Sequence, residues 1–313
     1  MIIAIDLGGT HIKSAIVTSD GKILHQRSQL THTEKGPDFV LQSIASIISY
    51  LTKHFPETVA IGLGVPGVVT GNGVIRVAPN FPNWINIPLK EYLEQRFPLP
   101  VAIDNDANVA ALAEAELGAG KNQQNFLFIT LGTGVGGCII SNGRIFRGAN
   151  GGAGEVGHII LHETDVPPIG KPSYRAGVLE EYVGRLGIIE LAKHYASLSP
   201  DSILHTHDDL DVHHISSAVS EGDSAAVECF KRTGELLGAA MSTALNLLDL
   251  QLIIAGGGIS KSHPLLLQTT LKTIKLRALP TIADDANIRL AHFSNDAGIL
   301  GAAMLAKQSL KTK

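Results

Sequence analysis

The chain of 313 residues contains only two cysteines, Cys138 and Cys229, and each lies inside an apolar segment. This scarcity argues against a disulfide framework and fits a reducing, cytoplasmic compartment. No apolar run approaches the roughly 18 residues that a membrane span needs, and the N-terminus lacks the basic segment and cleavage site of a signal peptide. The net formal charge is only −4, which provides no broad basic surface for nucleic acid. We therefore expect a cytoplasmic protein that binds neither membrane nor nucleic acid.

Apolar residues, in contrast, are plentiful and follow regular patterns. Hydrophobic residues make up 44% of the chain and charged residues 17%, which is enough apolar material for a sizeable core. Apolar runs bounded by turn residues predict strands, and apolar residues at helical spacing predict helices. The predicted strands cover 2–6, 12–17, 59–67, 101–104 and 252–260, and the predicted helices cover 38–54, 226–250 and 296–308. Strands that alternate with helices indicate an α/β architecture.

One pattern occurs twice. Residues 2–23 and 126–145 each contain an apolar strand, a glycine-rich turn, a second apolar strand, an Asp-Gly or Asn-Gly turn, and a third strand. A unit present once in each half implies two similar domains that face each other, with the glycines at the strand ends lining a shared cleft. The alternative interpretation is a chance similarity between two β-hairpins.

The first glycine turn comes directly after an aspartate, in the stretch Asp6-Leu7-Gly8-Gly9-Thr10. A turn without side chains lets backbone N–H groups approach an anion closely. Thr10 can donate its hydroxyl to a phosphate oxygen, and Asp6 can hold the Mg²⁺ that accompanies a phosphate chain, directly or through water. We interpret this turn as a phosphate site; the alternative is a plain hairpin turn.

The second turn, Gly132-Thr133-Gly134-Val-Gly-Gly137, formally matches the dinucleotide pattern G-x-G-x-x-G. That pattern requires a helix after the glycines, whereas a hairpin sequence follows here, so the dinucleotide interpretation fails and a hairpin clamp on phosphates remains. A third bare turn, Gly256-Gly257-Gly258, follows the strand that comes after the long helix. It could pack against a flat nucleoside or serve only as a tight strand-to-helix turn.

Polar residues gather at three further places. Asp104, Asn105 and Asp106 lie where a strand ends and a helix begins. One capping residue would suffice at such a junction, and this group is larger than a cap needs. Glu155 and His158 stand three residues apart among glycines, and Glu180 follows later. Carboxylates, amides and imidazoles together both accept and donate hydrogen bonds, as recognition of a polyol requires.

These motifs resemble those of the ROK sugar kinases (repressor, open reading frame, kinase). In family order the chain contains AIDLGGTHIK, GLGVPGVV, APNFPNW, IDNDANVAALAE, LGTGVGGCIISNGRIFRGANGGAGEVGHI and LIIAGGGIS. The resemblance implies an α/β fold of two actin-like (ribonuclease H-like) domains that flank a central cleft. We expect a smaller N-terminal domain, 1–105 plus about 295–313, closed by the C-terminal helix, and a larger C-terminal domain, 106–294.

The resemblance also implies roles for individual residues. Asp106 corresponds to the catalytic base of the family. The implied sugar contacts are Gly67, Asn105, Asp106, Glu155, His158 and Glu180. The implied contacts to ATP and its phosphates are Asp6, Gly8, Gly9, Thr10, Lys13, Gly132, Thr133, Gly134, Gly256, Gly257 and Gly258, with Mg²⁺ at Asp6 through water.

One departure from the family pattern concerns zinc. Many members carry a Cys-x-Cys-Gly-x-x-Gly-Cys segment between the Gly-His pair and the following glutamate, which makes a structural zinc site with the histidine. Here that segment reads ETDVPPIGKPSYRAGVLE, without cysteine, so we expect no structural zinc. The His-rich stretch 205–214 has metal-ligand residue types, but a solvated loop is the simpler interpretation, and its role is open.

The expected activity is ATP-dependent phosphorylation of a hexose, glucose to glucose 6-phosphate first of all, by a homodimer that binds a small-molecule sugar and a nucleotide. The alternatives are an N-acylhexosamine kinase for N-acetylglucosamine or N-acetylmannosamine, and a polyphosphate-dependent glucokinase, because polyphosphate-using relatives also lack these cysteines. A sugar-responsive regulator is a further alternative. It is disfavoured because such relatives carry an N-terminal helix-turn-helix, whereas the first strand here begins at Ile2.

Overall fold

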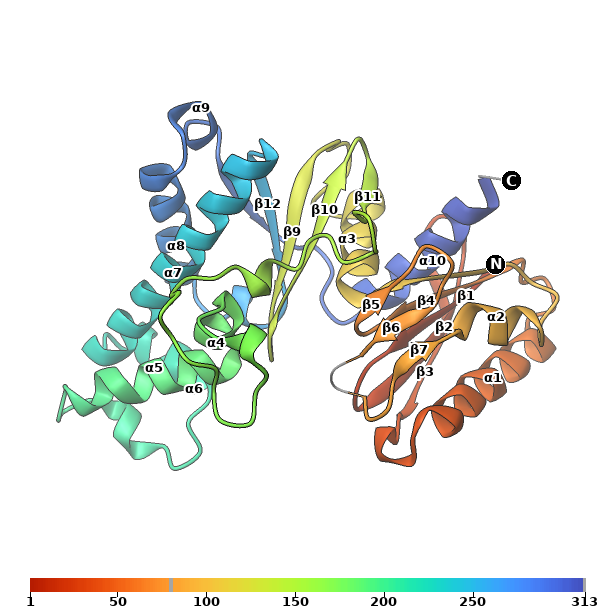
Figure 1. The fold of residues 1–313 in the computed structure, drawn as a ribbon, viewed down its shortest axis with the longest axis horizontal. Coiled ribbons are helices and arrows are strands. Elements are labelled where there is room, and N and C mark those ends of the chain that lie inside the picture. Colours follow the sequence, from red (N-terminus) through yellow and green to blue (C-terminus); the bar gives the residue numbers. More distant parts are fainter. Residues whose placement is uncertain (79–80, 312–313) are drawn as a thin grey trace. The chain divides into compact units, whose positions relative to one another are not determined.

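The computed structural model describes residues 1–78 and 81–311 and separates into two compact units (Figure 1). Unit 1 consists of Met1–Gln124, Cys138–Ala153 and the segment from Asn295 onward, and unit 2 of Asn125–Gly137 and Gly154–Ser294. Residues 79 and 80 of the APNFPNW motif lie outside the described residues. In the described part of the chain, no helix combines the length and apolar character that a membrane span requires.

Two five-stranded sheets have the same strand order. The first, β3-β2-β1-β4-β8, consists of β1 (Ile2–Leu7), β2 (His11–Val17), β3 (Ile23–Leu30), β4 (Ala60–Val65) and β8 (Val101–Asn105). The second, β11-β10-β9-β12-β13, consists of β9 (Phe126–Leu131), β10 (Val135–Ser141), β11 (Arg144–Phe146), β12 (Leu252–Gly256) and β13 (Asn287–Leu290). In both sheets the outermost hairpin is antiparallel and the last two pairings are parallel. The repeat predicted from the sequence is therefore a repeat of structure.

The core of unit 1 forms where helix α1 (Pro37–His54) packs on the first sheet. Ile44, Ile48 and Leu51 of this helix are buried together with Ile3 and Ile5 of β1. Their helical spacing is the pattern that predicted the helix, and it places one apolar face against the sheet. The unit also contains a small sheet of β5 (Val68–Val69), β6 (Ile75–Val77) and β7 (Ile85–Ile87), the helix α2 (Leu89–Glu94) and the 3₁₀ turn η1 (Thr33–Lys35).

Helices α3 (Asp106–Leu117) and α10 (Ala297–Lys311) pack closely in unit 1 because small residues line their contact. A Cβ atom on Gly301 of α10 would lie 1.7 Å from the carbonyl oxygen of Val109, and one on Gly62 of β4 would lie 1.9 Å from that of Ala302. Backbones that approach so closely leave no room for a side chain. This packing assigns α3 to unit 1, whereas the division expected from the sequence placed residues 106–294, and α3 with them, in the second domain.

Unit 2 surrounds its part of the second sheet with helices. These are α4 (Leu179–Val183), α5 (Arg185–Ser197), α6 (Val212–Ser220), α7 (Ser224–Leu248), α8 (Pro264–Arg277) and α9 (Pro280–Ala283), with 3₁₀ turns η2 (Val156–His158), η3 (Ser173–Arg175), η4 (Ile203–Thr206) and η5 (Ile259–Lys261). Asp223 caps α7 by accepting a hydrogen bond from the Ala226 amide at 2.9 Å. Gly234 and Gly238 of α7 let α8 approach closely, because a Cβ on either would meet α8 within 2.7 Å.

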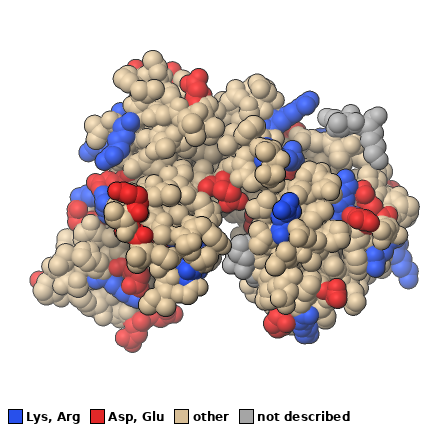
Figure 2. Space-filling view, in the orientation of Figure 1, with Lys and Arg blue, Asp and Glu red and all other residues tan. Residues whose placement is uncertain are grey.

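On the face shown in Figure 2, lysine and arginine side chains are interspersed with aspartate and glutamate side chains. This mixture agrees with the small net charge of the sequence, −4.

Candidate functional site

The first glycine turn joins β1 to β2 and is held from both sides. The Gly8 amide donates to the His11 carbonyl at 2.9 Å, which closes the turn. Thr31, fully buried at the end of β3, donates its hydroxyl to the Gly8 carbonyl at 2.7 Å, and its amide donates to the Thr10 carbonyl at 2.9 Å. The turn is therefore rigid before any ligand arrives. The predictions from the sequence did not include Thr31, because a lone threonine 21 residues after Thr10 carries no pattern.

Asp6 lies directly before this turn, opposite Lys13 in the β1–β2 pairing. The Lys13 ammonium is 3.8 Å from the Asp6 carboxylate and donates to the Asn295 carbonyl at 3.2 Å. Gly298, near the start of α10, lies so close that a Cβ there would be 2.5 Å from the Asp6 carboxyl carbon. Burial raises the pKa of Asp6 above its ordinary value, and the Lys13 charge opposes this shift.

A magnesium ion fits this carboxylate. Mg²⁺ is usually bound by one or two carboxylates together with substrate phosphates and water. Asp6 is poorly hydrated, and a cation would offset the cost of its ionisation. Zinc does not fit: in residues 1–78 and 81–311, no group of three or more His, Cys, Asp or Glu side chains could hold a metal ion.

The second glycine turn joins β9 to β10. The Gly132 amide donates to the Gly134 carbonyl at 3.0 Å, and the Gly132 carbonyl accepts from the Arg185 amide at 3.0 Å. Gly134 faces the Glu180 carboxylate, which a Cβ would meet at 2.2 Å. Thr133 is exposed at the tip of the turn. Two of the predicted site groups, the turn and Glu180, are therefore in contact.

The predicted glycines fall into two classes according to what a side chain there would meet. At Gly257, which has φ +84°, a Cβ would lie 2.1 Å from the Leu131 carbonyl oxygen, so the fold itself requires glycine. At Gly9, Gly132 and Gly258 a Cβ would find no heavy atom within 4 Å, and none of the three has positive φ. No contact within the fold requires glycine at these three positions, whereas close approach of a ligand to the backbone would.

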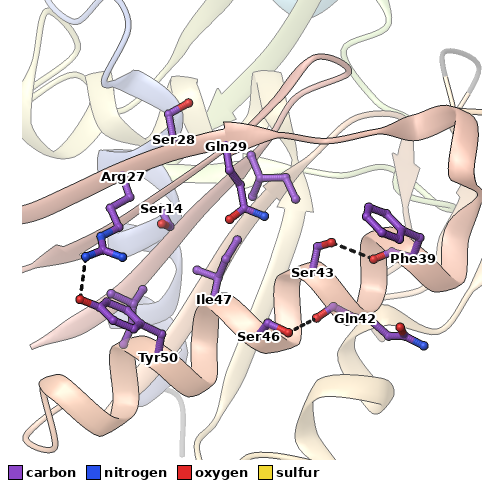
Figure 3. Close-up of a pocket in the computed structure, with 12 residues that line it drawn as sticks. Ser14, Arg27, Ser28, Gln29, Phe39, Gln42, Ser43, Ser46, Ile47 and Tyr50 are labelled. Carbon is purple, nitrogen blue, oxygen red and sulfur yellow. Dashed lines mark hydrogen bonds between the residues drawn. The ribbon is translucent and has the colours of Figure 1, made fainter.

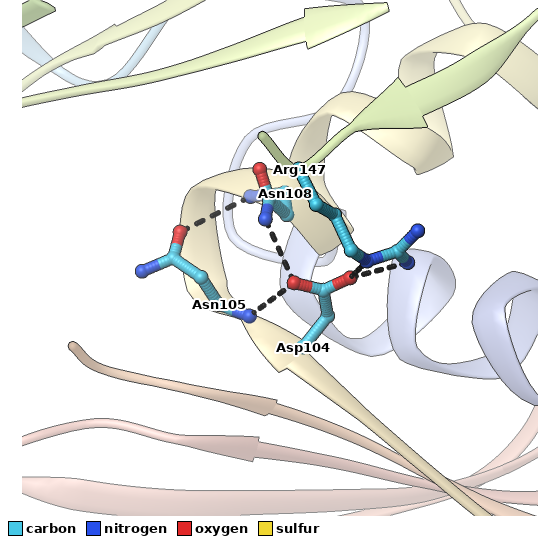
Figure 4. Close-up of polar contacts among 4 residues, drawn as sticks. All are labelled: Asp104, Asn105, Asn108 and Arg147. Carbon is cyan, nitrogen blue, oxygen red and sulfur yellow. Dashed lines mark hydrogen bonds and ion pairs between the residues drawn. The ribbon is translucent and has the colours of Figure 1, made fainter. Parts of the chain in front are cut away.

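The polar cluster at the end of β8 has a buried member, Asp104 (Figure 4). Its carboxylate accepts from Arg147 Nε at 2.9 Å and Nη2 at 2.6 Å, and from Asn108 Nδ2 at 2.7 Å. A buried carboxylate with this number of donors is a structural anchor. Arg147 is a partner that the sequence reading missed, because 43 residues separate it from Asp104.

Asn105 and Asp106 form the start of α3. The Asn105 side-chain oxygen accepts from the Ala107 amide at 2.8 Å and the Asn108 amide at 3.3 Å, which makes it the N-cap. Its Nδ2 donates to the Gly67 carbonyl at 2.9 Å. Asp106 is exposed, and one of its oxygens accepts from the Ala107 amide at 2.8 Å.

Gly67 is required by the backbone at the turn between β4 and β5. Its φ is +88°, and a Cβ would lie 2.0 Å from the Val77 carbonyl oxygen. Because the Asn105 side chain donates a hydrogen bond to the Gly67 carbonyl, this turn is fixed to the start of α3. The structure therefore brings together Gly67, Asn105 and Asp106 in unit 1.

Glu155, His158 and Glu180 come together in unit 2. The pKa of Glu155 is raised, chiefly by loss of hydration and further by the Glu180 carboxylate, while His158 opposes the shift. Glu180 Oε2 accepts from the Val135 amide at 2.7 Å, and Oε1 accepts from Arg175. Two neighbouring carboxylates and an imidazole offer several acceptors and a donor to a hydroxylated ligand.

The His-rich stretch 205–214 has a local structural role. The rings of His207 and His214 stack with centroids 4.1 Å apart. Asp211 caps α6 by accepting from the Val212 amide at 2.7 Å, and its own amide donates to His214 Nδ1 at 3.1 Å. This arrangement is a capping box, which accounts for Asp211 and His214 without a ligand.

A separate cavity of about 440 Å³ lies between β2, β3 and α1 (Figure 3). Arg27 of β3 donates to the Tyr50 hydroxyl of α1 at 2.7 Å, and its guanidinium stands 4.2 Å above the Tyr50 ring. Ile12 and Ser14 line this cavity, while Lys13 between them points to the other face of the sheet, toward Asp6. None of the predicted site residues lines it.

Comparison with known proteins identifies the family of this chain. The profile of the ROK family matches residues 2–309. The chain belongs to the ROK family. It is 37% identical to the glucokinase of Halalkalibacterium halodurans, over 98% of this chain and 94% of that protein.

Two further relatives cover most of the chain. The crystal structure of a ROK family glucokinase from Streptomyces griseus, in complex with glucose and AMPPNP, is 31% identical with a TM-score of 0.79, over 98% of this chain and 99% of that one. The N-acetylmannosamine kinase of Escherichia fergusonii is 29% identical over 97% of this chain and 98% of that protein. These matches confirm the family and the α/β fold with two actin-like domains that the sequence predicted.

Proposed function

We propose that this ROK family protein transfers the γ-phosphoryl group of ATP to the 6-hydroxyl of glucose. The observation that carries the proposal is the set of open glycines after β1, β9 and β12: at Gly9, Gly132 and Gly258 a Cβ would meet no heavy atom of residues 1–78 and 81–311 within 4 Å. Backbone N–H groups at such turns suit a polyphosphate chain. The relatives that bear the glucokinase name, one of them with glucose and AMPPNP bound, support both the acceptor and the donor.

In this mechanism Asp106 is the general base. As the 6-hydroxyl oxygen forms its bond to the γ-phosphorus, its proton passes to the Asp106 carboxylate, and the bond from that phosphorus to the bridging oxygen of ADP breaks. Asn105 fixes the start of α3 as its N-cap, which orients the next residue, Asp106. Asp6 is the residue that would hold Mg²⁺, which supplies neutralisation of phosphate charge when bound.

The proposed sugar contacts are Gly67, Asn105 and Asp106 of unit 1, and Glu155, His158 and Glu180 of unit 2. In unit 1, the Asn105 amide uses one hydrogen on the Gly67 carbonyl, and its second is available to a hydroxyl. In unit 2, Glu155 and Glu180 accept hydrogen bonds from hydroxyls and His158 adds a donor or acceptor. A site that bonds each hydroxyl discriminates strongly against a sugar that lacks one.

A coupled phosphorylation assay over a panel of sugars tests the proposal. The panel contains glucose, mannose, N-acetylglucosamine and N-acetylmannosamine, each with ATP and with polyphosphate as donor. We expect the highest kcat/KM for glucose with ATP. A higher kcat/KM for an N-acylhexosamine would contradict glucose as the acceptor. Turnover with polyphosphate alone would contradict ATP as the donor.

A further inference from the structure

Backbone contacts close the segment between His158 and Glu180. Its base is closed by a bridge between Ile160 and Val178 and by a hydrogen bond from the Leu161 amide to the Gly177 carbonyl at 2.8 Å. Gly177 has φ +64°, and a Cβ there would lie 1.8 Å from the His162 carbonyl oxygen. The sequence of the segment contains no cysteine, and zinc does not fit it.

Arg175 is the residue that ties this segment to helix α4. Its Nε donates to Glu181 at 2.6 Å, and its Nη1 donates to Glu180 Oε1. The Arg175 side chain is only 14% exposed, so both ion pairs are largely shielded from water. Burial by itself would lower the pKa of Arg175, but the hydrogen bonds to the two carboxylates hold it above its ordinary value. The guanidinium is therefore a permanent cation between two glutamates.

Through Glu180, the contact of Arg175 extends to the second glycine turn. With Oε1 held by Arg175, Glu180 presents Oε2 to the Val135 amide at 2.7 Å, directly after Gly134. The residue before Arg175, Tyr174, has its ring 5.9 Å from that of His158. The short 3₁₀ turn Ser173–Arg175 thus touches two of the proposed sugar-binding side chains.

We propose that Arg175 is a positioning residue that orients Glu180 for sugar binding. Its guanidinium holds the segment between His158 and Glu180 against α4, where zinc does not fit. This inference rests on the proposed function, because it assigns Glu180 to the sugar. A planar guanidinium with several donors can hold two carboxylates in one geometry, as an ammonium cannot. Arg175 also offsets the repulsion between Glu180 and Glu155, whose pKa Glu180 raises.

Three variants test the assignment: Arg175→Gln, Arg175→Lys, and Arg232→Gln as the matched control. Arg232 also forms an Arg–Glu pair in unit 2, with Glu235 at 3.1 Å on the exposed face of α7, and touches none of the proposed site residues. The first readout needs no substrate: hydrogen exchange of the Val135 amide in the native protein. We expect exchange on the order of tenfold faster in Arg175→Gln, because Glu180 loses its fixed orientation.

The second readout is glucose binding by calorimetry together with steady-state kinetics. For Arg175→Gln we expect the Kd and KM for glucose to rise about 10- to 100-fold, with a smaller fall in kcat. The larger change in KM than in kcat is expected because Arg175 acts on the orientation of a sugar contact and not on the reacting atoms. Arg175→Lys should recover part of the affinity, and Arg232→Gln should match the wild type.

The outcomes separate the two proposals. Unchanged Val135 exchange in a folded Arg175→Gln variant, or unchanged Kd and KM for glucose, would overturn the positioning role while the kinase assignment stands. If Arg175→Gln does not fold, the same criteria apply to Arg175→Lys. A wild-type protein that phosphorylates no sugar would overturn the proposed function, and the exchange measurement would then decide the role of Arg175 by itself.

Discussion

The two five-stranded sheets have the same strand order, but different side chains stand at the ends of their strands. In the first sheet β1 carries Asp6, which pairs with Gly64 of β4; in the second sheet β9 carries Thr130, which pairs with Gly256 of β12. Thr130 thus occupies the place that Asp6 has in the repeat. β8 leads into Asp106 and helix α3, whereas its counterpart in the second sheet, β13, ends at Leu290 without a carboxylate.

The difference shows that repetition of a fold does not repeat its chemistry. Under the proposed function, the glycine turns recur because a tight hairpin and the close approach of a phosphate both require a backbone without side chains. Of the carboxylates at the strand ends of the first sheet, Asp104 is a structural anchor for Arg147, and the proposed function assigns a cation to Asp6 and a proton to Asp106. Under the proposed function, the strand ends of unit 1 supply the charged groups and those of unit 2 supply backbone donors.

The largest expected effect separates two aspartates of unit 1 that stand two residues apart. Asp106→Asn should lower kcat by about 10²- to 10⁴-fold while glucose still binds, since the change removes a base but keeps the shape. Asp104→Asn should instead lower the free energy of unfolding by roughly 1–3 kcal/mol, because it weakens the buried contact with Arg147. Kinetics and denaturant unfolding of both variants check this. Full turnover in Asp106→Asn would remove its role as base.

The substitution Asp6→Asn tests the difference between Asp6 and Thr130, its counterpart in the second sheet. The folded pKa of Asp6 is raised, so the folded protein binds this proton more tightly than the unfolded chain. Its stabilising effect is therefore present below the ordinary pKa of 3.8 and is lost as pH rises through the folded pKa. At pH 7 we expect Asp6→Asn to be more stable than the wild type and to bind Mg–ATP more weakly.

The measurements are thermal unfolding at several pH values and calorimetric titration with ATP and Mg²⁺. The gain in stability should shrink as the pH approaches 3.8, the ordinary pKa of the group. A variant less stable than the wild type at pH 7 would show that the Lys13 pair outweighs the cost of burial.

The adjacent glycines Gly257 and Gly258 of unit 2 offer a smaller, paired test. Gly257→Ala should lower the free energy of unfolding by at least about 1–2 kcal/mol, because its backbone is left-handed and a Cβ collides with Leu131. Gly258→Ala should leave stability unchanged and raise the KM for ATP roughly tenfold, or about 1.4 kcal/mol. Equal kinetics in Gly258→Ala and the wild type would mean that no nucleotide approaches this turn.

The smallest effect is expected from zinc removal. Elemental analysis of the purified protein should find no stoichiometric zinc, because the segment between His158 and Glu180 carries no cysteine. Treatment with a chelator followed by excess Mg²⁺ should leave kcat unchanged. One tightly bound zinc per chain, lost together with activity, would contradict this expectation and make the histidines of 205–214 the candidate ligands.

Much of this arrangement is visible in the sequence by itself. The alternation of apolar runs and helical spacing determined the α/β class, since burial of one face leaves a periodic trace. The two glycine-rich hairpins predicted the repeat, and the lack of cysteine between His158 and Glu180 is the basis for expecting no structural zinc. These features are local, so they depend on neighbours within a few residues along the chain.

Tertiary structure alone decided which polar residues serve the fold. Asp104 and Asp106 are the same residue type, yet the strand-to-helix junction between them buries one against Arg147 and exposes the other. The packing of α10 against α3 assigned that helix to unit 1, and Arg175 became a partner of Glu180 only through chain folding. The first two contacts join groups distant in sequence, and the third, between residues five positions apart, depends on the 3₁₀ turn Ser173–Arg175, so none of them leaves a periodic pattern in the sequence.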